Sequence, residues 1–212
     1  MKAALAGSAG FIGTHLIDLL RSDKTFAEID VLSRRELELP KKFNMLVGDV
    51  SKCELENPID VAFCALGTTM ATAGSKEAFY HVDHDMVIQF AEKAKRAGVQ
   101  TFVLVSSLGA DASSSNYYLN VKGETEKDLE RIGFNSLVIL RPSMLLGERK
   151  DFRLGELIGK GAMTLFDPFM LGGLKKYRGI HGLTVAKAML KLAKENLTGV
   201  HILESDALQA FA

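Results

Sequence analysis

Three glycines near the start of the chain restrict its fold more than any other feature of the sequence. Gly7, Gly10 and Gly13 follow an apolar run at residues 2–6 and lead into a helical pattern at residues 11–21. In a strand–turn–helix unit the first glycine permits a tight turn. The second lets a pyrophosphate approach the main chain, and the third brings helix and strand together. The helix N-terminus would then face the phosphates with N–H groups and the positive end of its dipole.

This pattern predicts a dinucleotide-binding turn, and the alternative is an ordinary strand–turn–helix. The spacing is G-x-x-G-x-x-G, which departs from the G-x-G-x-x-G of the common dinucleotide fingerprint. The residues predicted to bind the cofactor here are Gly7, Ser8, Ala9, Gly10, Phe11, Ile12 and Gly13.

Composition limits the classes of protein that the chain can belong to. Its 212 residues, 47% of them apolar, are enough for one α/β domain over residues 1–212. Lys+Arg and Asp+Glu number 26 each, so the net charge of zero gives nucleic-acid binding no support. No apolar stretch approaches the roughly 18 residues of a membrane span. Because the apolar run begins at residue 2, we expect no signal peptide and a cytoplasmic protein.

Cysteines and histidines give no metal-binding pattern. Cys53 and Cys64 have no C-x-x-C spacing and are interpreted as reduced structural residues. His81 and His84 share a predicted helix over residues 79–97 but lack an evident third ligand. We therefore predict no metal site.

The end of the second predicted strand, residues 28–32, bears on which dinucleotide binds. In a doubly wound fold this position lies beside the adenosine ribose, where a carboxylate would repel a 2′-phosphate. The residues present are Ser33, Arg34 and Arg35. A hydroxyl and two guanidinium groups suit a 2′-phosphate, which favours NADP over NAD. The alternative is a solvated basic turn.

The third and fourth predicted strands end in further candidates. Asp49, after the strand at residues 43–47, is either an adenine contact or a turn-capping residue, and Val50 would be an apolar wall. The near-continuous apolar strand at residues 59–66 must border the cofactor at its end, because strand order reverses beside it. The residues predicted to line the cofactor there are Leu66, Gly67, Thr68 and Thr69. Residues 70–75 are predicted to form a mobile loop.

A second motif follows the fifth predicted strand, residues 101–105. Tyr118 and Lys122 are four residues apart and share a helix face, downstream of Ser106 and Ser107. A free tyrosine titrates near about pH 10, and a nearby ammonium favours its phenolate form. A serine hydroxyl can bind a carbonyl oxygen as charge builds there. We predict Ser107, Tyr118 and Lys122 as catalytic residues, with Ser106 as the alternative serine and a helix-surface pair as the alternative for Tyr118 and Lys122. Ser106, Tyr118 and Lys122 are also predicted to contact the cofactor, with Lys122 at the nicotinamide ribose.

These segments together resemble the atypical short-chain dehydrogenases/reductases, with a nucleoside-diphosphate-sugar-epimerase-like fold. More narrowly they resemble the Tat-interacting-protein-like oxidoreductases. The segments that carry the resemblance are residues 7–13, 33–35, 65–69, 82–83, 106–111, 118–124, 141–143 and 147–149. The resemblance implies an NADP-binding Rossmann domain. It also implies that Arg141, Pro142 and Ser143 lie at the nicotinamide end of the cofactor.

We therefore predict a single doubly wound parallel sheet with strand order 3-2-1-4-5-6 and room for a seventh edge strand. Residues 142–182 would form a small substrate or lid region, too small for a bulky nucleotide-sugar. The predicted function is NADPH-dependent reduction of a small carbonyl compound by a monomer or homodimer. The alternative is an NADPH-binding regulatory or scaffold protein with a protein partner, and sugar-nucleotide epimerisation is less favoured.

Overall fold

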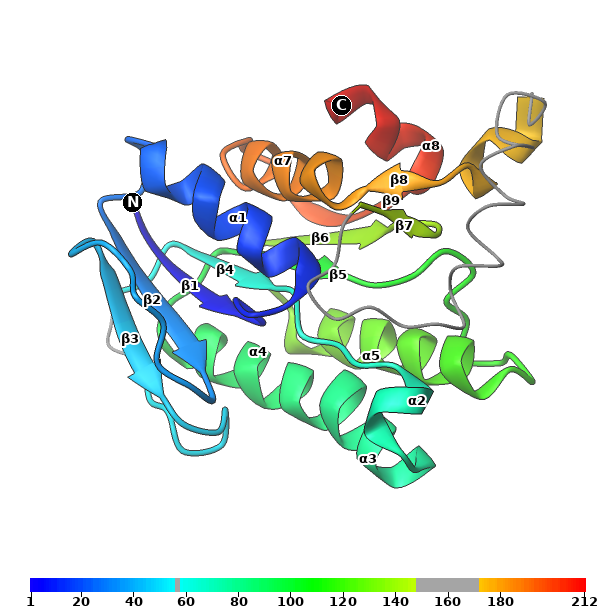
Figure 1. The fold of residues 1–212 in the computed structure, drawn as a ribbon, viewed down its shortest axis with the longest axis horizontal. Coiled ribbons are helices and arrows are strands. Elements are labelled where there is room, and N and C mark those ends of the chain that lie inside the picture. Colours follow the sequence, from blue (N-terminus) through cyan, green and yellow to red (C-terminus); the bar gives the residue numbers. More distant parts are fainter. Residues whose placement is uncertain (56–57, 148–171) are drawn as a thin grey trace.

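A parallel sheet forms the centre of the protein (Figure 1). The computed structural model describes residues 1–55, 58–147 and 172–212. All pairings in this sheet are parallel, and the strand order is β3-β2-β1-β4-β5-β6-β9. The predicted doubly wound order is confirmed, and β9 is the additional edge strand. The strands are β1 (Lys2–Ala6), β2 (Glu28–Ser33), β3 (Phe43–Val47), β4 (Val61–Cys64), β5 (Thr101–Val105), β6 (Ser136–Arg141) and β9 (Gly199–Glu204).

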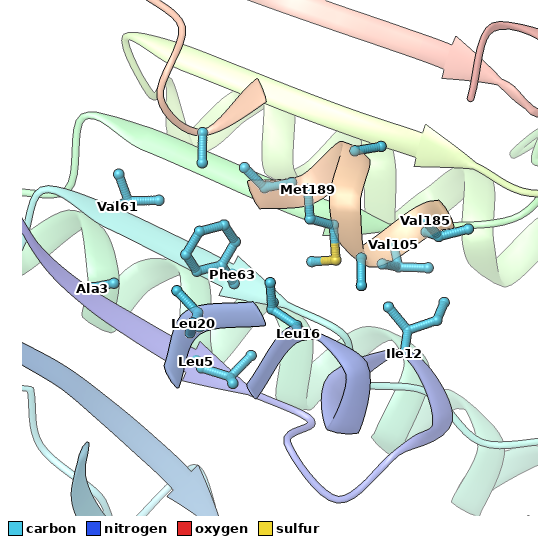
Figure 2. Packing of buried hydrophobic residues seen from close by; sticks show 14 of the residues in the cluster. Ala3, Leu5, Ile12, Leu16, Leu20, Val61, Phe63, Val105, Val185 and Met189 are labelled. Carbon is cyan, nitrogen blue, oxygen red and sulfur yellow. The ribbon is translucent and has the colours of Figure 1, made fainter. Parts of the chain in front are cut away.

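Helices cover both faces of the sheet, which explains why its central strands are apolar on both sides. Helices α1 (Phe11–Ser22) and α7 (Gly182–Leu192) lie on one face, and α4 (Met86–Arg96) and α5 (Tyr117–Ile132) lie on the other (Figure 1). Figure 2 shows Leu16 of α1 and Met189 of α7 packing over Phe63 of β4. None of the described helices has the length and apolarity to cross a membrane.

The strand order reverses at β1, as the sequence predicts. β1 pairs with β2 on one side and β4 on the other. The chain leaves β1 toward the α1 face, whereas the segment after β4 runs to the opposite face (Figure 1). The carboxyl ends of β1 and β4 therefore lie at the topological switch point of the sheet, which is where doubly wound folds bind ligands.

The segment between β4 and α4 is more helical than predicted. The predicted mobile loop at residues 70–75 is wrong, because Met70–Ala73 forms the short helix α2. Thr69 caps α2 by accepting a hydrogen bond from the Thr72 N–H, as a Ser or Thr before a helix commonly does. The single helix predicted over residues 79–97 is instead α3 (Lys76–Tyr80), a π-helical turn η1 (His81–Asp85) and α4.

The carboxyl-terminal part adds small elements beyond β6. They are β7 (Leu145–Leu146), η3 (Gly172–Tyr177), β8 (Ile180–His181), α8 (Ser205–Leu208) and η4 (Gln209–Phe211). β7 and β8 form a separate parallel pair. Most of the predicted substrate or lid region at residues 142–182 lies outside the described residues.

Gly7 is required by two independent constraints. Its φ of +88° lies in the left-handed region, and a Cβ there would lie 2.3 Å from the carbonyl carbon and oxygen of Ala65. Gly98 has nearly the same φ, +87°, but a Cβ there would meet nothing within 4 Å. Comparing Gly7 with Gly98 therefore distinguishes the cost of a left-handed backbone from the cost of steric overlap with neighbouring backbone.

We expect Gly98→Ala to lower the free energy of unfolding by about 1–2 kcal/mol, the cost of a left-handed residue with a Cβ. Gly7→Ala should lower it by about 3 kcal/mol or more, because overpacking against rigid backbone adds to that strain. Urea unfolding of both variants measures the difference. Equal unfolding midpoints would show that β4 does not press on this turn.

Candidate functional site

The turn between β1 and α1 has the geometry of an anion site. The Gly10 N–H donates to the Gly7 carbonyl oxygen at 3.0 Å, which closes the turn before α1 begins. No side chain caps α1, and its first turn contains no acidic residue, so nothing in it offsets the positive end of the helix dipole. Ala9 and Gly10 are exposed. A phosphate can therefore reach the main chain at this turn.

Two further observations fit a dinucleotide at this turn. A Cβ on Gly13 would lie 2.1 Å from the Gly7 carbonyl oxygen, so α1 approaches the turn more closely than any side chain permits. The Ser8 hydroxyl is buried and has no hydrogen-bond partner among the described residues. Such an orphan group calls for a bound water or ligand nearby.

The end of β2 leaves positive charge available beside the turn. Arg34 and Arg35 are exposed, and neither forms an ion pair with any residue in the described ranges, although Glu36 and Glu38 follow them. The nearest carboxylate on β2, Asp30, is buried and paired with Lys2 at 3.3 Å. The buried Ser33 hydroxyl accepts from the Arg35 N–H at 3.3 Å. The residues after β2 thus present two guanidinium groups, and no β2 carboxylate competes for them.

Asp49 shows the turn-capping arrangement that was one of its two interpretations. Its Oδ1 accepts hydrogen bonds from the Ser51 N–H at 2.9 Å and the Ser51 hydroxyl at 2.7 Å. These hydrogen bonds lower the pKa of Asp49, which favours the carboxylate. Its Oδ2 has no hydrogen-bond donor in the described part of the chain, so an adenine contact stays a prediction. Val50 is buried in the cluster on the α4 face.

The end of β4 is held by an acid that sequence reasoning did not assign to the site. Asp83, in the π-helical turn η1, is fully buried. Its Oδ2 accepts from the Thr68 N–H at 2.7 Å, and its Oδ1 lies 2.7 Å from Nζ of Lys122. Asp83 entered the sequence analysis only as part of the family resemblance at residues 82–83. Its unusual burial within a turn of charged residues is visible only in the folded protein.

Lys122 is a buried ammonium that stays charged. Burial by itself would lower the pKa of Lys122, but Asp83 and then Tyr118 outweigh it, and the pKa is raised. Gly67 lies beside the pair, since a Cβ there would be 3.3 Å from Asp83 Oδ1 and 3.7 Å from Lys122 Nζ. Gly67, Thr68 and Lys122, which were predicted separately as site residues, are therefore gathered at one end of β4.

The two serines after β5 have different surroundings. Ser106 is buried, and its hydroxyl donates to Glu126 of α5. The Ser107 side chain is half-buried and has no hydrogen bond to any described residue. Ser106 is thus engaged in the interior, which leaves the Ser107 hydroxyl as the one available to another molecule.

The two tyrosines that open α5 differ in the same way. The Tyr117 hydroxyl donates to the Lys76 carbonyl oxygen at 2.9 Å. The Tyr118 ring packs against Phe79 with centroids 5.6 Å apart, and within the described ranges its hydroxyl makes no hydrogen bond. Tyr118 is the tyrosine with Lys122 one helical turn further along.

Gly123, inside α5, lets the loop after β5 lie against the helix that carries Tyr118 and Lys122. A Cβ on Gly123 would lie 2.1 Å from the Ala112 nitrogen and 2.2 Å from the Asp111 carbonyl carbon. The loop after β5 can therefore cross α5 only at this residue. A glycine in a helix interior lowers helix stability, and this cost was a signal of close backbone approach that the sequence analysis did not use.

The residues at the end of β6 make contacts within the protein. Arg141 pairs with Glu126, its Nε lying 3.1 Å from Oε1, and this hydrogen-bonded pair raises the pKa of Arg141. Ser143 shares a hydrogen bond with buried Ser205 at 2.8 Å and donates to the Arg178 carbonyl oxygen. Pro142 is buried. Contact of these three residues with the nicotinamide end of the cofactor stays a prediction.

A family of known proteins matches most of this chain. The model of the NAD(P)H-binding family matches residues 7–163, which include the glycine turn, Asp83, Tyr118 and Lys122. The chain belongs to the NAD(P)H-binding family. Binding of a nicotinamide dinucleotide is therefore the property that members of this family share, and the site described above lies within the matched region.

Curated relatives place this NAD(P)H-binding protein more narrowly. Protein FMP52-1, mitochondrial, of Scheffersomyces stipitis is 35% identical, with 92% of this chain and 89% of the relative covered. Protein HTATIP2 of Rattus norvegicus is 34% identical, with 96% of this chain and 86% of the relative covered. The resemblance to the Tat-interacting-protein-like group is thereby confirmed. The predicted cytoplasmic location is wrong by this comparison, because several fungal relatives are named as mitochondrial proteins.

Solved structures share the fold. Human epimerase family protein SDR39U1 with NADPH aligns with a TM-score of 0.67 at 18% identity, over 96% of this chain and 74% of that one. MoeE5 in complex with UDP-glucose and NAD aligns with a TM-score of 0.72 at 19% identity, over 96% of this chain and 75% of that one. At these identities the likeness establishes the Rossmann-like, epimerase-type fold.

The buried contacts among Ser106, Glu126 and Arg141 should contribute strongly to stability. Glu126→Ala leaves a largely buried guanidinium and a buried hydroxyl without their common partner, so we expect a loss of about 3 kcal/mol in unfolding free energy. The control is Asp18→Ala, which breaks an exposed pair with Arg21 at 3.5 Å and should cost less than about 1 kcal/mol. Urea denaturation compares them, and a similar loss in both would contradict this account.

Proposed function

We propose that this NAD(P)H-binding protein is an NADP(H)-dependent oxidoreductase that reduces a small carbonyl compound, with Tyr118 as the proton donor. One observation carries the proposal. In the serine pair after β5 and the tyrosine pair at the start of α5, Ser106 and Tyr117 are hydrogen-bonded inside the protein, while Ser107 and Tyr118 have hydroxyls without a partner in the described part of the chain. These two hydroxyls accompany the buried ammonium of Lys122.

The three side chains have complementary tasks in such a reduction. NADPH, when bound, would supply the hydride for the carbonyl carbon. Ser107 donates a hydrogen bond to the carbonyl oxygen, and Tyr118 transfers its proton to that oxygen as negative charge develops. The product is an alcohol, and the Lys122 ammonium stabilises the phenolate that Tyr118 becomes. The Tyr118 proton is then replaced from solvent.

One observation supports the preference for NADP in this proposal. Arg34 and Arg35, exposed and without ion-pair partners in the described ranges, suit the 2′-phosphate of NADP, which NAD lacks. The choice of a small carbonyl compound over a nucleotide-sugar is part of the proposal and is tested by the carbonyl screen below.

The preference for NADP depends on the guanidinium groups. We expect Arg34→Ala/Arg35→Ala to raise the dissociation constant for NADPH at least about ten-fold, since charge-assisted hydrogen bonds to the 2′-phosphate are lost. The dissociation constant for NADH should not change. Fluorescence titrations with both nucleotides measure this, with exposed Arg131→Ala as a control for loss of a surface arginine. Equal weakening for both nucleotides would contradict the 2′-phosphate assignment.

The role of Tyr118 is tested on the activity itself. A panel of small aldehydes and ketones is screened by the loss of NADPH absorbance. Tyr118→Phe should then reduce turnover at least about 100-fold, because the proton donor is lost. NADPH binding should persist. Tyr117→Phe is the matched control and should retain turnover, since its hydroxyl bonds to the Lys76 carbonyl.

Two results would count against the reductase. If Tyr117→Phe and Tyr118→Phe retain equal activity, Tyr118 is not the proton donor. If NADPH binds tightly but no carbonyl is reduced, the protein is a cofactor-binding regulator or scaffold.

A further inference from the structure

Asp83 is a fully buried acid that lies beside Lys122, the proposed catalytic lysine, but it has no role in the proposed reaction. It lies in η1, the π-helical turn that joins α3 to α4. Turns of this kind are rare in helices and often occur at functional sites. Burial of a carboxylate is costly unless it is paired and hydrogen-bonded, so the contacts of Asp83 must be specific.

Each oxygen of Asp83 binds a different element of the fold. Oδ1 lies 2.7 Å from Nζ of Lys122 on α5, and Oδ2 accepts from the Thr68 N–H after β4 at 2.7 Å. The Asp83 carbonyl oxygen also accepts from the Thr125 hydroxyl on α5 at 2.9 Å. The residue therefore fixes the distance between the end of β4 and the ammonium of Lys122.

We infer that Asp83 is the positioning residue of this site, which holds the Lys122 ammonium at the end of β4 where the cofactor ribose and Tyr118 can both use it. This inference rests on the proposed function. A lysine ammonium has three N–H donors, and Asp83 takes one of them, which leaves the others for the cofactor and Tyr118. Without this contact, a flexible four-carbon side chain would have to place a buried charge by itself.

Gly67 places exposed main chain beside this ion pair. A Cβ at Gly67 would lie 3.3 Å from Asp83 Oδ1 and 3.7 Å from Lys122 Nζ, and Gly67 itself is exposed. The Lys122 ammonium is therefore buried but lies next to a residue at the protein surface. In the proposed function, this surface borders the cofactor.

An amide cannot replace this carboxylate. Both carboxylate oxygens of Asp83 face positive or donor groups: Oδ1 forms an ion pair with the Lys122 ammonium, and Oδ2 accepts a hydrogen bond from a backbone N–H. Asparagine has only one acceptor oxygen, and its NH₂ group is a donor. In Asp83→Asn, either Lys122 or the Thr68 N–H must therefore face another donor, although the side chain keeps its size.

The test is a double-mutant cycle on NADPH binding, with Asp83→Asn, Lys122→Met and the double variant. If Asp83 acts through Lys122, Asp83→Asn raises the dissociation constant about ten-fold in the wild-type background. It has little further effect once Lys122 is methionine. If the two factors multiply, Asp83 does not position Lys122 and the inference fails. If the wild-type protein does not bind NADPH, the proposed function fails first.

The stability of the protein without cofactor provides a second readout. Lys122→Met leaves the Asp83 carboxylate buried without its counter-charge, so the melting temperature should fall. Adding Asp83→Asn should restore part of that loss, although the same change is destabilising in the wild-type background. Destabilisation by Asp83→Asn in both backgrounds would contradict the ion pair.

Asp23 offers a matched control far from the site. Its Oδ1 accepts from the Thr25 N–H at 2.8 Å, and its Oδ2 lies 2.7 Å from Lys194 Nζ, which repeats the arrangement at Asp83. Asp23→Asn should leave the NADPH dissociation constant unchanged. If Asp83→Asn does not fold, Thr125→Val replaces it, because it removes only the hydroxyl that holds the Asp83 main chain. Thr125→Val should raise the NADPH dissociation constant by a smaller factor, about three-fold, and this effect must also vanish in the Lys122→Met background. If the effect persists there, the inference is overturned.

Discussion

The positions of the other site residues depend on one close contact between two main-chain segments, at Gly7 and at Ala65. A Cβ at Gly7 would fall 2.3 Å from the Ala65 carbonyl, so only glycine allows the turn after β1 to lie against the end of β4. This contact sets the start of α1, with its positive dipole end, next to the segment that Asp83 holds. The turn predicted to bind phosphate is thereby fixed to the end of β4 through backbone, and the Asp83 carboxylate connects that end to Lys122.

α5 carries charged residues that form ion pairs on both sides of β5. Tyr118, Lys122 and Glu126 succeed one another at intervals of four residues and so form a stripe along the helix. Lys122 pairs with Asp83 on the β4 side, and Glu126 binds Ser106 and Arg141 at the ends of β5 and β6. Each buried charge in this stripe has an opposite charge from another element. Tyr118, which needs an outside partner in the proposed reaction, is left at the helix start.

Local signals in the sequence predicted the strands and the glycine turn, because apolar runs and glycine spacing are properties of neighbouring residues. The strand order was predicted from the doubly wound fold that these elements indicate, and it is confirmed. The π-helical turn was not predicted, because η1 continues a helical pattern on both sides. The ion pair of Asp83 with Lys122 and that of Glu126 with Arg141 were also missed. They join residues that are distant in the chain, and no periodicity reports which charges will meet after folding.

Adjacent residues with the same chemistry are separated by geometry that sequence alone does not weigh. Successive side chains at the end of a strand point to opposite sides, so Ser106 reaches Glu126 while Ser107 does not. Successive helical residues are about 100° apart, so the Tyr117 hydroxyl reaches the Lys76 carbonyl oxygen while the Tyr118 hydroxyl does not, although both rings contact Phe79. Packing against Phe79 restrains the Tyr118 ring without engaging its hydroxyl. A hydroxyl without a partner among the described residues can therefore still be held in one place, which is what proton transfer to a bound substrate requires.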